Sequence, residues 1–420
     1  MNKILIANYR YFIAGGPERY MFNFISAANE RGIEVIPFSV QNPRNESNPY
    51  STYFAKPRSD SLMYSDTKKS LRNIYGMIRA TVWNYDAAKK IRKLIRDTRP
   101  DAVYILHEIN HLSPSIIRAA KKEGVRVVHR ISDFFMFCAR YDFLCGDNVC
   151  EECLHGDYSS AIRCKCMKNS TAGTWLRVFA MKLYSTLGVF DDVDQYIATC
   201  EFSRGKLIEG GIDKDKITVI PTFIDIRDIE PCYEDKGYFL FLGRMARQKG
   251  VIYAIEAMRY IESDKSRLVI TGDLNESSED YEAIRELIDR YNLADRIEFA
   301  GFKVGAELNR LLDGAMCVLC PSIWYDNMPN SVLEAYAHGK PVIASRLGSL
   351  EEIVEDNHTG LLFTPKDSYD IACKMQYMAD NPDERNRMGK NARLKCEECY
   401  NPDIHMKKVF DVLGLKNYYN

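Results

Sequence analysis

The hydrophobic positions of the chain form a first series of short apolar runs that alternate with amphipathic stretches. The apolar runs are KILIAN (3–8), IEVIPFSV (33–40), DAVYIL (101–106), VRVVHRI (125–131) and QYIAT (195–199). The stretches between them carry apolar residues at helical spacing, as in RYMFNFISAANERG, where Gly32 is placed to end the helix. Helices are also predicted over about 66–98 and over SPSIIRAAKKEG, and 41–61 is predicted to be a loop. This half therefore alternates strands with helices.

A second series of the same kind follows a connection at about 221–236. Its predicted strands are YFLFLG, RLVITG, RIEFAG, CVLC, PVIAS and GLLF. Two such series predict an α/β protein with two doubly wound, Rossmann-like parallel sheets that face a cleft. The predicted domains are 1–222 and 223–400, and residues 401–420 should form a helix that crosses back toward the first domain.

Net charge and the lengths of the apolar runs indicate which partners the protein binds and in which cellular compartment it is found. A net charge of -1 over 420 residues gives no general attraction to nucleic acid. No apolar run approaches the roughly 18–20 residues that a membrane-spanning helix needs, and the apolar stretch at the N-terminus is too short for a signal peptide. We therefore expect a cytoplasmic location.

Residues 137–168 interrupt the strand and helix pattern and hold six of the thirteen cysteines. Cytosolic thiols stay reduced, so a dense cluster favours metal binding over disulfides. The spacing favours one structural zinc ion on Cys138, Cys150, Cys153 and Cys166. Reduced free thiols in a loop, or a redox-sensitive disulfide, are the alternatives. A four-cysteine site leaves no position for substrate, so its role would be to fold this insertion.

Two loops between a strand and a helix are candidates for binding an anion. Gly15 and Gly16 would let backbone N–H groups approach a phosphate at a helix N-terminus, although an ordinary turn explains them equally. Arg244 and Lys249 are cations that suit a diphosphate, and solvated loop charges are the alternative.

Acidic residues mark two further loops. Asp326 precedes a predicted helix start at Asn330 and Ser331, and Glu334 could accept two ribose hydroxyls. Ser331 with Glu334 also fits a capping box, which would explain Glu334 without a ligand. Asp133 follows a strand of the first domain and is placed either to meet a substrate or to cap a helix.

Two other patterns have structural explanations. The pairs Asp192/Asp194 and Asp213/Asp215 resemble a metal-binding DxD, but turn or capping roles suit them, and no catalytic metal is expected. The helix predicted over 174–190 has an apolar stripe that suits either a buried face or contact with a membrane surface. The stripe consists of Trp175, Val178, Phe179, Leu183 and Leu187.

Taken together, GGPE, RPDAVYILHEINHLSPSI, GRMARQKGV and PSIWYDNMPNSVLEAYAHGKPVIASRLGSLEEIVEDNHTGLLF resemble the retaining glycosyltransferases of family four, which have the GT-B architecture. The resemblance implies transfer of a sugar from a UDP- or GDP-sugar to a glycan or lipid-linked acceptor, in bacterial surface polysaccharide synthesis. Such a reaction would take place in the cytoplasm or at the inner membrane face. It is typical of such enzymes to need no catalytic metal.

The resemblance also implies roles for the candidate residues. Arg244 and Lys249 would bind the donor diphosphate, Glu334 the ribose and Asp326 the sugar. Amides near Asn330 and Ser331 would add donors to the phosphates, and Gly15 and Gly16 would line the acceptor and phosphate side. Asp133 would act in catalysis.

The sequence departs from the family pattern at two positions. Asp326 replaces the first glutamate of Glu-x7-Glu, and Ser132 stands where many members have a histidine before Asp133. His129 lies an odd number of residues upstream and should face the other way. These departures keep two alternatives open: a non-catalytic sugar- or nucleotide-binding protein, and a nucleotide-sugar epimerase on the same scaffold.

Overall fold

The computed structural model describes residues 2–57, 70–109, 111–262, 266–272 and 279–416. Within it the chain forms two compact units. Unit 1 comprises Met1–Cys145, Cys150–Ile220 and His405–Asn420, and unit 2 comprises Gly146–Val149 and Pro221–Ile404. The division at Ile220 and Pro221 falls close to the predicted boundary at 222–223, and most of the last helix groups with unit 1.

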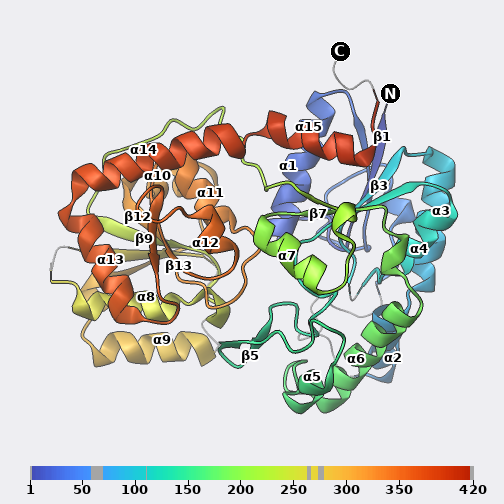
Figure 1. The fold of residues 1–420 in the computed structure, drawn as a ribbon, viewed down its shortest axis with the longest axis horizontal. Coiled ribbons are helices and arrows are strands. Elements are labelled where there is room, and N and C mark those ends of the chain that lie inside the picture. Colours follow the sequence, from blue (N-terminus) through green and yellow to red (C-terminus); the bar gives the residue numbers. More distant parts are fainter. Residues whose placement is uncertain (1, 58–69, 110, 263–265, 273–278, 417–420) are drawn as a thin grey trace. The chain divides into compact units, whose positions relative to one another are not determined.

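Each unit contains one six-stranded, wholly parallel sheet (Figure 1). The sheet of unit 1 consists of β1 (Lys3–Asn8), β2 (Glu34–Phe38), β3 (Ala102–His107), β4 (Arg126–Arg130), β7 (Gln195–Ala198) and β8 (Ile217–Val219). They are arranged in the order β2-β1-β3-β4-β7-β8. Two further short strands, β5 (Leu144–Cys145) and β6 (Asn148–Val149), lie in the cysteine-rich insertion. The sheet of unit 2 consists of β9 (Tyr238–Leu242), β10 (Arg267–Thr271), β11 (Ile297–Gly301), β12 (Ala315–Cys320), β13 (Val342–Ser345) and β14 (Gly360–Phe363). Their order is β11-β10-β9-β12-β13-β14.

Helices connect these strands and cover the sheets. In unit 1 they are α1 (Gly16–Glu30), α2 (Leu71–Val82), α3 (Tyr85–Thr98), α4 (Ser115–Lys122), α5 (Ser159–Arg163), α6 (Thr171–Thr186) and α7 (Glu201–Glu209). In unit 2 they are α8 (Val251–Ala257), α9 (Glu279–Arg290), α10 (Gly305–Gly314), α11 (Asn330–Ala337), α12 (Ser349–Ile353), α13 (Ser368–Asp380) and α14 (Pro382–Cys399). Helix α15 (Pro402–Leu413) follows.

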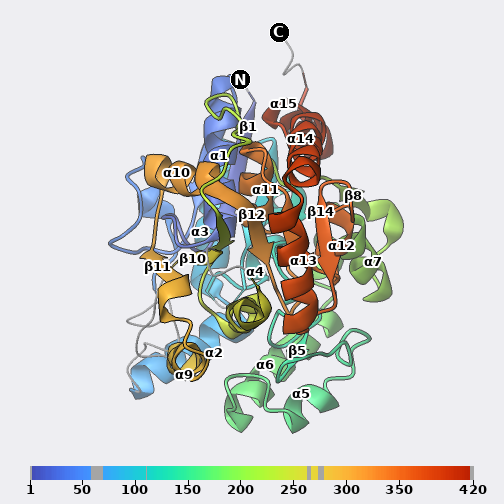
Figure 2. The same cartoon turned by 90° about the vertical axis from the view of Figure 1, so that its left-hand side faces the viewer.

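Helices cover both faces of the unit 2 sheet (Figure 2). Because side chains alternate between the two faces along each strand, both faces carry apolar residues that pack against helices. Phe239 and Phe241 of β9 pack into one apolar cluster, whereas Tyr238 and Leu240 of the same strand pack into another. The first cluster includes residues of α8, α9 and α13, and the second includes residues of α10, α11 and α14. The predicted two-sheet α/β fold is confirmed.

One predicted helix is two helices. The helical region expected over about 66–98 breaks between α2 and α3, and residues 66–69 lie outside the described ranges. Trp83 is extended, and the side chain of Asn84 accepts a hydrogen bond from the Ala87 N–H at 3.1 Å, which caps α3. The Asn84 amide also donates to the carbonyl of His111 at 2.6 Å. Asn84, which is held by the loop at His111, therefore caps α3 and separates it from α2.

The last helix packs on unit 1 through its own buried residues. His405 Nε2 lies 2.9 Å from the hydroxyl of Tyr20 on α1, and the Phe410 ring lies 6.4 Å from that of Phe24. Arg126 of β4 donates to the carbonyl of Val412 at 2.8 Å. These contacts fix His405–Leu413 of α15 on unit 1.

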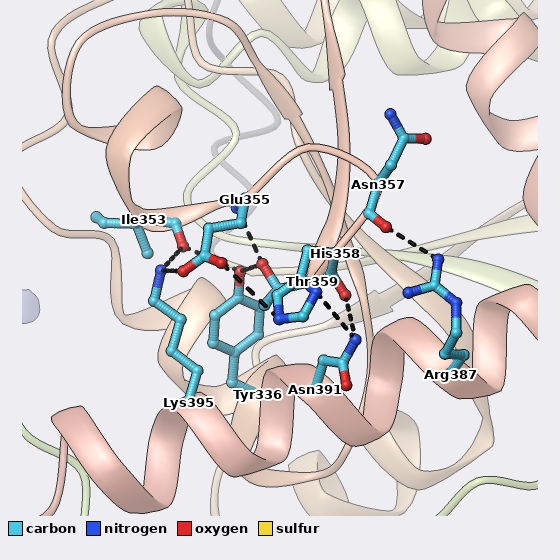
Figure 3. A network of polar contacts seen from close by, with 9 residues as sticks. All are labelled: Tyr336, Ile353, Glu355, Asn357, His358, Thr359, Arg387, Asn391 and Lys395. Carbon is cyan, nitrogen blue, oxygen red and sulfur yellow. Dashed lines mark hydrogen bonds and ion pairs between the residues drawn. The ribbon is translucent and has the colours of Figure 1, made fainter.

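A polar network in unit 2 attaches α14 to the segment before β14 (Figure 3). Tyr336 of α11 lies 2.7 Å from the Thr359 hydroxyl and donates to the Ile353 carbonyl at 3.2 Å. Lys395 of α14 donates to the same carbonyl at 2.9 Å and to Glu355 at 2.7 Å. The network fixes α11, whose first turn belongs to the candidate site, against two neighbouring segments.

Candidate functional site

In unit 2, a left-handed glycine sets the path of the loop after β9. Gly250 has φ 68°, and a Cβ built there would lie 1.9 Å from the Pro321 carbonyl oxygen. Only glycine fits this approach without strain. The Ile323 N–H donates to the Gln248 carbonyl at 3.0 Å, so the loop that carries Lys249 lies directly against the loop after β12.

This close approach brings Lys249 and Asp326 together. Lys249 Nζ donates to Asp326 Oδ2, and the Ser322 hydroxyl donates to the same oxygen at 3.2 Å. The Ser349 hydroxyl donates to the Asp326 backbone carbonyl. The two side chains are 19% and 9% exposed, so this is a largely buried ion pair. The ammonium also lies 5.4 Å from the centroid of the Trp324 ring.

Arg244 is not part of this pair. It follows β9 and is exposed, and its guanidinium makes no hydrogen bond or ion pair within the described residues. The structure therefore brings Lys249 and Asp326 together and leaves Arg244 as an exposed cation on the same loop as Lys249.

Helix α11 begins at Asn330, with Pro329 as its N-cap, and no side chain caps it. Ser331 is thus inside the helix, and its hydroxyl bonds to the buried thiol of Cys320. The alternative that Ser331 and Glu334 form a capping box is therefore wrong. Glu334 is half-buried one turn into the helix. Among the described residues, the Val332 N–H donates to the Pro329 carbonyl at 3.1 Å, and the amides of Asn330 and Ser331 remain for an anion.

In unit 1, Asp133 lies just after β4 and is held through both carboxylate oxygens. Oδ1 accepts the Phe135 N–H at 2.9 Å, and Oδ2 lies 3.1 Å from His107 Nε2. No helix begins in this segment, so the alternative that Asp133 is a helix cap is wrong. Ser132 donates to the Leu106 carbonyl at 2.9 Å.

Burial governs the acidity of Asp133. It raises the pKa of this carboxyl, and the nearby charge of His107 only partly offsets the increase. Asp133 therefore binds a proton more readily than an exposed aspartate does. His107 was missed as a candidate. The signal was present, because it closes the strand in DAVYILHE, and that strand neighbours the one before Asp133.

A second histidine and carboxylate pair lies beside the first. His129 Nε2 is 3.1 Å from Glu108 Oε2, with side chains only 8% and 1% exposed. Burial raises the pKa of Glu108, but the charge of His129 and its hydrogen bond outweigh this effect, so the pKa is lowered overall. His129 thus pairs with Glu108 and not with Asp133.

Gly15 and Gly16 lie at the start of α1, as expected. Gly15 is extended and forms the N-cap without a side-chain hydrogen bond. A buried carboxylate, Glu18, occupies the first turn, and its Oε2 lies 3.5 Å from the Cβ position of Gly15. The protein thus places its own negative charge at this helix end.

Of the two DxD-like pairs, only Asp213/Asp215 has the expected turn-capping role, whereas Asp192 and Asp194 contact distant segments. Asp192 pairs with Arg118 at 2.6 Å, and Asp194 accepts the Val127 N–H at 2.8 Å. Asp213 caps a short turn by accepting the Asp215 N–H at 3.0 Å.

The cysteines of the insertion lie around one small apolar cluster. Cys153 packs with Tyr158, Val178 and Met181, and Cys166 packs against the same group. Cys145 and Cys164 share a hydrogen bond, which raises the pKa of Cys145 to about 11. None of the thirteen cysteines, all of which lie within the described residues, is in a disulfide. In the part of the chain that the structure describes, no group of three or more Cys, His, Asp or Glu is arranged to hold a metal ion.

The apolar stripe of α6 does not face the core as a unit. Val178 is buried, but Trp175 and Phe179 are 56% and 57% exposed. The buried face is instead Thr174, Arg177, Val178, Ala180, Met181 and Tyr184. Arg177 turns inward because its guanidinium donates to the Phe135 carbonyl at 2.6 Å. The interpretation of the stripe as a buried face is therefore wrong for Trp175 and Phe179.

Two family models match the chain. "Glycosyl transferases group 1" matches residues 223–395, and "Glycosyltransferase Family 4" matches residues 14–228. No helix among the described residues is long and apolar enough to cross a membrane.

Curated relatives agree with these models. An uncharacterized glycosyltransferase of Methanocaldococcus jannaschii is 31% identical over 43% of this chain and 45% of its own length. A UDP-Gal:alpha-D-GlcNAc-diphosphoundecaprenol alpha-1,3-galactosyltransferase of Escherichia coli is 25% identical over 71% of this chain and 77% of its own. The chain spans about half the length of the first curated relatives it matches.

Solved structures share the fold. Sucrose-phosphate synthase from Thermosynechococcus elongatus superposes with a TM-score of 0.72 at 18% identity, and the alignment covers 99% of each chain. Anabaena HepE, solved with UDP and glucose, has a TM-score of 0.69 at 15% identity and covers 99% of this chain and 100% of its own. At these identities the likeness establishes the architecture.

Proposed function

The chain belongs to glycosyltransferase family 4 and has the GT-B architecture, and from this we propose that it transfers a sugar from a nucleotide-sugar donor to an acceptor hydroxyl, with retention at the anomeric carbon. The observation that carries the proposal is the Lys249–Asp326 pair beside the first turn of α11. A cation, a carboxylate and free helix amides at the carboxyl ends of parallel strands suit a sugar diphosphate.

The donor is bound in unit 2. Lys249 supplies a point charge, and the exposed Arg244 supplies a fork of N–H donors for the diphosphate. Charge grows on the leaving diphosphate in the transition state, so these cations stabilise that state more than the bound donor. The amides at Asn330 and Ser331 add to this field, Glu334 accepts the ribose hydroxyls, and Asp326 contributes a carboxylate toward the sugar while it neutralises Lys249.

Unit 1 contributes Asp133 as the catalytic carboxylate on the acceptor side. Its carboxyl is 17% exposed, so a hydroxyl can reach it, and its orientation is fixed by the Phe135 amide and His107. Gly15 and Gly16 line the same side at the start of α1. The acceptor is a glycan or a lipid-linked sugar, which the name of the Escherichia coli galactosyltransferase supports.

The donor is a UDP- or GDP-sugar. HepE was solved with UDP and glucose, and the galactosyltransferase is named for UDP-galactose, which together favour UDP. We test this by calorimetry of the purified chain against UDP, GDP and their glucose, galactose, mannose and N-acetylglucosamine derivatives.

The test compares Arg244→Ala with Arg310→Ala. Arg310 is an exposed arginine of α10 whose one hydrogen bond among the described residues is within its own helix, to the Ala306 carbonyl at 3.2 Å. Saturable binding of one donor that Arg244→Ala loses and Arg310→Ala keeps supports the proposal. A folded chain that binds none of these compounds contradicts it and favours a non-catalytic scaffold. Conversion of the donor into another nucleotide sugar without acceptor would indicate the epimerase.

The insertion binds one structural zinc ion through Cys138, Cys150, Cys153 and Cys166. The support is chemical: the segment concentrates thiols around the cluster at Cys153, and soft thiolates are preferred zinc ligands. Zinc binding would require the thiols to move closer together, because no three ligands among the described residues are arranged to hold a metal ion in this structure.

Zinc is tested by elemental analysis of the purified chain and of two variants. One equivalent of zinc in the wild type and in Cys373→Ser, an exposed cysteine of α13, with loss in Cys150→Ser, is the expected result. A wild type purified without chelators that holds no zinc and takes up none contradicts the assignment.

The exposed face of α6 contacts an anionic membrane surface. Trp175 and Phe179 project outward, and α6 packs beside α2, which exposes Tyr75 and Ile78 (Figures 1 and 2). Neither helix carries an acidic residue, so the patch combines apolar groups with exposed cations such as Lys182. Such a surface fits the headgroup region of anionic lipids. A lipid-linked acceptor and cysteines that form no disulfide favour the cytoplasmic side of that membrane.

Sedimentation with phosphatidylglycerol vesicles tests this contact. The wild type and Tyr369→Ser, which removes an exposed aromatic of unit 2, should sediment with the vesicles. Trp175→Ser combined with Phe179→Ser should stay in solution. Equal sedimentation of all three proteins would overturn the assignment.

A further inference from the structure

The His107–Asp133 pair is partly exposed, unlike a fully buried ion pair. His107 ends β3, and Asp133 follows the neighbouring strand β4. The two side chains are 16% and 17% exposed, so the pair lies at the surface of the sheet's carboxyl edge. The parallel pair Glu108–His129 has the same 3.1 Å separation but is enclosed. Successive residues of one strand point to opposite faces, which separates the two pairs.

The ring of His107 is held in place by aromatic neighbours. Tyr9, which follows β1, packs edge-on at 4.8 Å between centroids, and Phe135 lies at 6.2 Å. Nδ1 is buried and has no hydrogen-bond partner among the described residues. The nitrogen that faces a partner is therefore Nε2, and that partner is Asp133.

We propose that His107 is a positioning residue for Asp133, and that its Nε2–H fixes the orientation of the carboxylate toward the reacting hydroxyl. The Phe135 amide occupies Oδ1 and the imidazole occupies Oδ2, so the carboxylate cannot rotate. One lone pair on each oxygen stays available to a substrate hydroxyl. The residue directly before Asp133 is a serine, and the imidazole that contacts the carboxylate comes from the adjacent strand. This inference rests on the proposed function for its consequence in catalysis.

The environment of Asp133 is defined by few charged groups. Its neighbours are His107 and Glu108 from the end of β3 and Arg177 from α6, together with the Phe135 amide. His107 and Arg177 lower the pKa of Asp133, and Glu108 raises it. Removal of His107 should therefore raise the pKa further, whereas His129 does not act on Asp133 directly.

The first experiment follows the carboxyl carbon of Asp133 by ¹³C NMR during a pH titration of the full chain. The resonance is assigned by its loss in Asp133→Asn. We expect His107→Phe, which keeps an aromatic ring, to raise the midpoint, and His107→Gln, which keeps an N–H near the Nε2 position, to restore most of it. His129→Phe is the matched control and should not raise the midpoint, because His129 acts on Asp133 only through Glu108, whose charge raises the pKa of Asp133. An unchanged midpoint in His107→Phe overturns the proposal.

The second experiment measures turnover of UDP-galactose, without acceptor and as transfer to water. Misplacement of one catalytic group costs about 10- to 100-fold in rate. We expect His107→Phe to lower kcat by that factor with little change in KM, and His107→Gln to recover most of it. An equal loss in His129→Phe would mean a general structural effect and would contradict the inference. If the chain binds no nucleotide sugar in the calorimetric test, the proposed function fails, and the titration of Asp133 still decides the positioning role.

Discussion

Lys249 of unit 2 forms a largely buried ion pair with Asp326, from a loop 77 positions further along the chain. The pair exists because Gly250 lets its loop lie against the Pro321 carbonyl. The proposed donor site and the stability of unit 2 thus share the same two side chains, and this relationship can be tested by mutation.

Substitution of either Lys249 or Asp326 by an uncharged residue should leave the other charge without a counterion. Asp326→Ala should lower the free energy of unfolding of unit 2 by about 3 kcal/mol, because Lys249 then stays buried without its counterion. The double variant Asp326→Ala with Lys249→Met should cost less than the sum of the single changes. Urea denaturation measures both. Glu307→Ala breaks the exposed Lys303–Glu307 pair and should cost at most about 1 kcal/mol; strict additivity at Lys249 and Asp326 would contradict the prediction.

A side chain at position 250 should separate the two loops. Gly250→Ala adds a Cβ that would meet the Pro321 oxygen at 1.9 Å, so the loop must move and take Lys249 away from Asp326. We expect a loss of stability above about 1 kcal/mol and loss of nucleotide-sugar binding. Gly237→Ala is the control, since Gly237 has φ 76° but nothing lies within 4 Å of its Cβ position. Equal stability losses in the two variants would show that backbone strain alone is responsible.

The network of Figure 3 should contribute to stability more than to chemistry. Tyr336→Phe removes the hydroxyl that bonds to Thr359 and Ile353, which should cost about 1 to 2 kcal/mol. Thermal or urea unfolding measures the loss, with Tyr369→Phe at an exposed position as the reference. A Tyr336→Phe variant as stable as the reference would mean that the network carries no net stabilisation.

Asp133 should impose a pH-dependent cost on folding. Burial raises the pKa of its carboxyl, so the folded state disfavours the charged form. The cost is absent below the pKa of the unfolded chain, near 4, and grows to its full value as the pH rises through the folded pKa. Asp133→Asn should therefore be more stable than the wild type at pH 7, and the difference should shrink toward pH 4.

Chemical denaturation at several pH values measures this difference. Asp133→Asn should at the same time lose turnover, which would separate the catalytic from the structural contribution of the carboxylate. A difference between the two proteins that stays constant from pH 4 to pH 7 would contradict the prediction.

The sequence by itself located eleven of the twelve strands of the two large sheets and most helices of both units, whereas β8 (Ile217–Val219) was not among the predicted strands. Runs such as KILIAN and YFLFLG are apolar throughout because both faces of a parallel sheet are covered, and this local signal needs no tertiary information. The positions of Lys249 and Asp326 after strands could likewise be predicted from the sequence, since loops at the carboxyl ends of parallel strands carry ligand-binding groups.

Tertiary structure decided which of these residues meet. Asn84 ends a helical pattern because it bonds to the carbonyl of His111, and α6 buries Arg177 while it exposes Phe179 because the Phe135 carbonyl accepts from the guanidinium. Sequence periodicity is set by neighbours a few residues away, whereas these contacts join distant segments. For the same reason His107 could be found beside Asp133 only once β3 and β4 were paired in register.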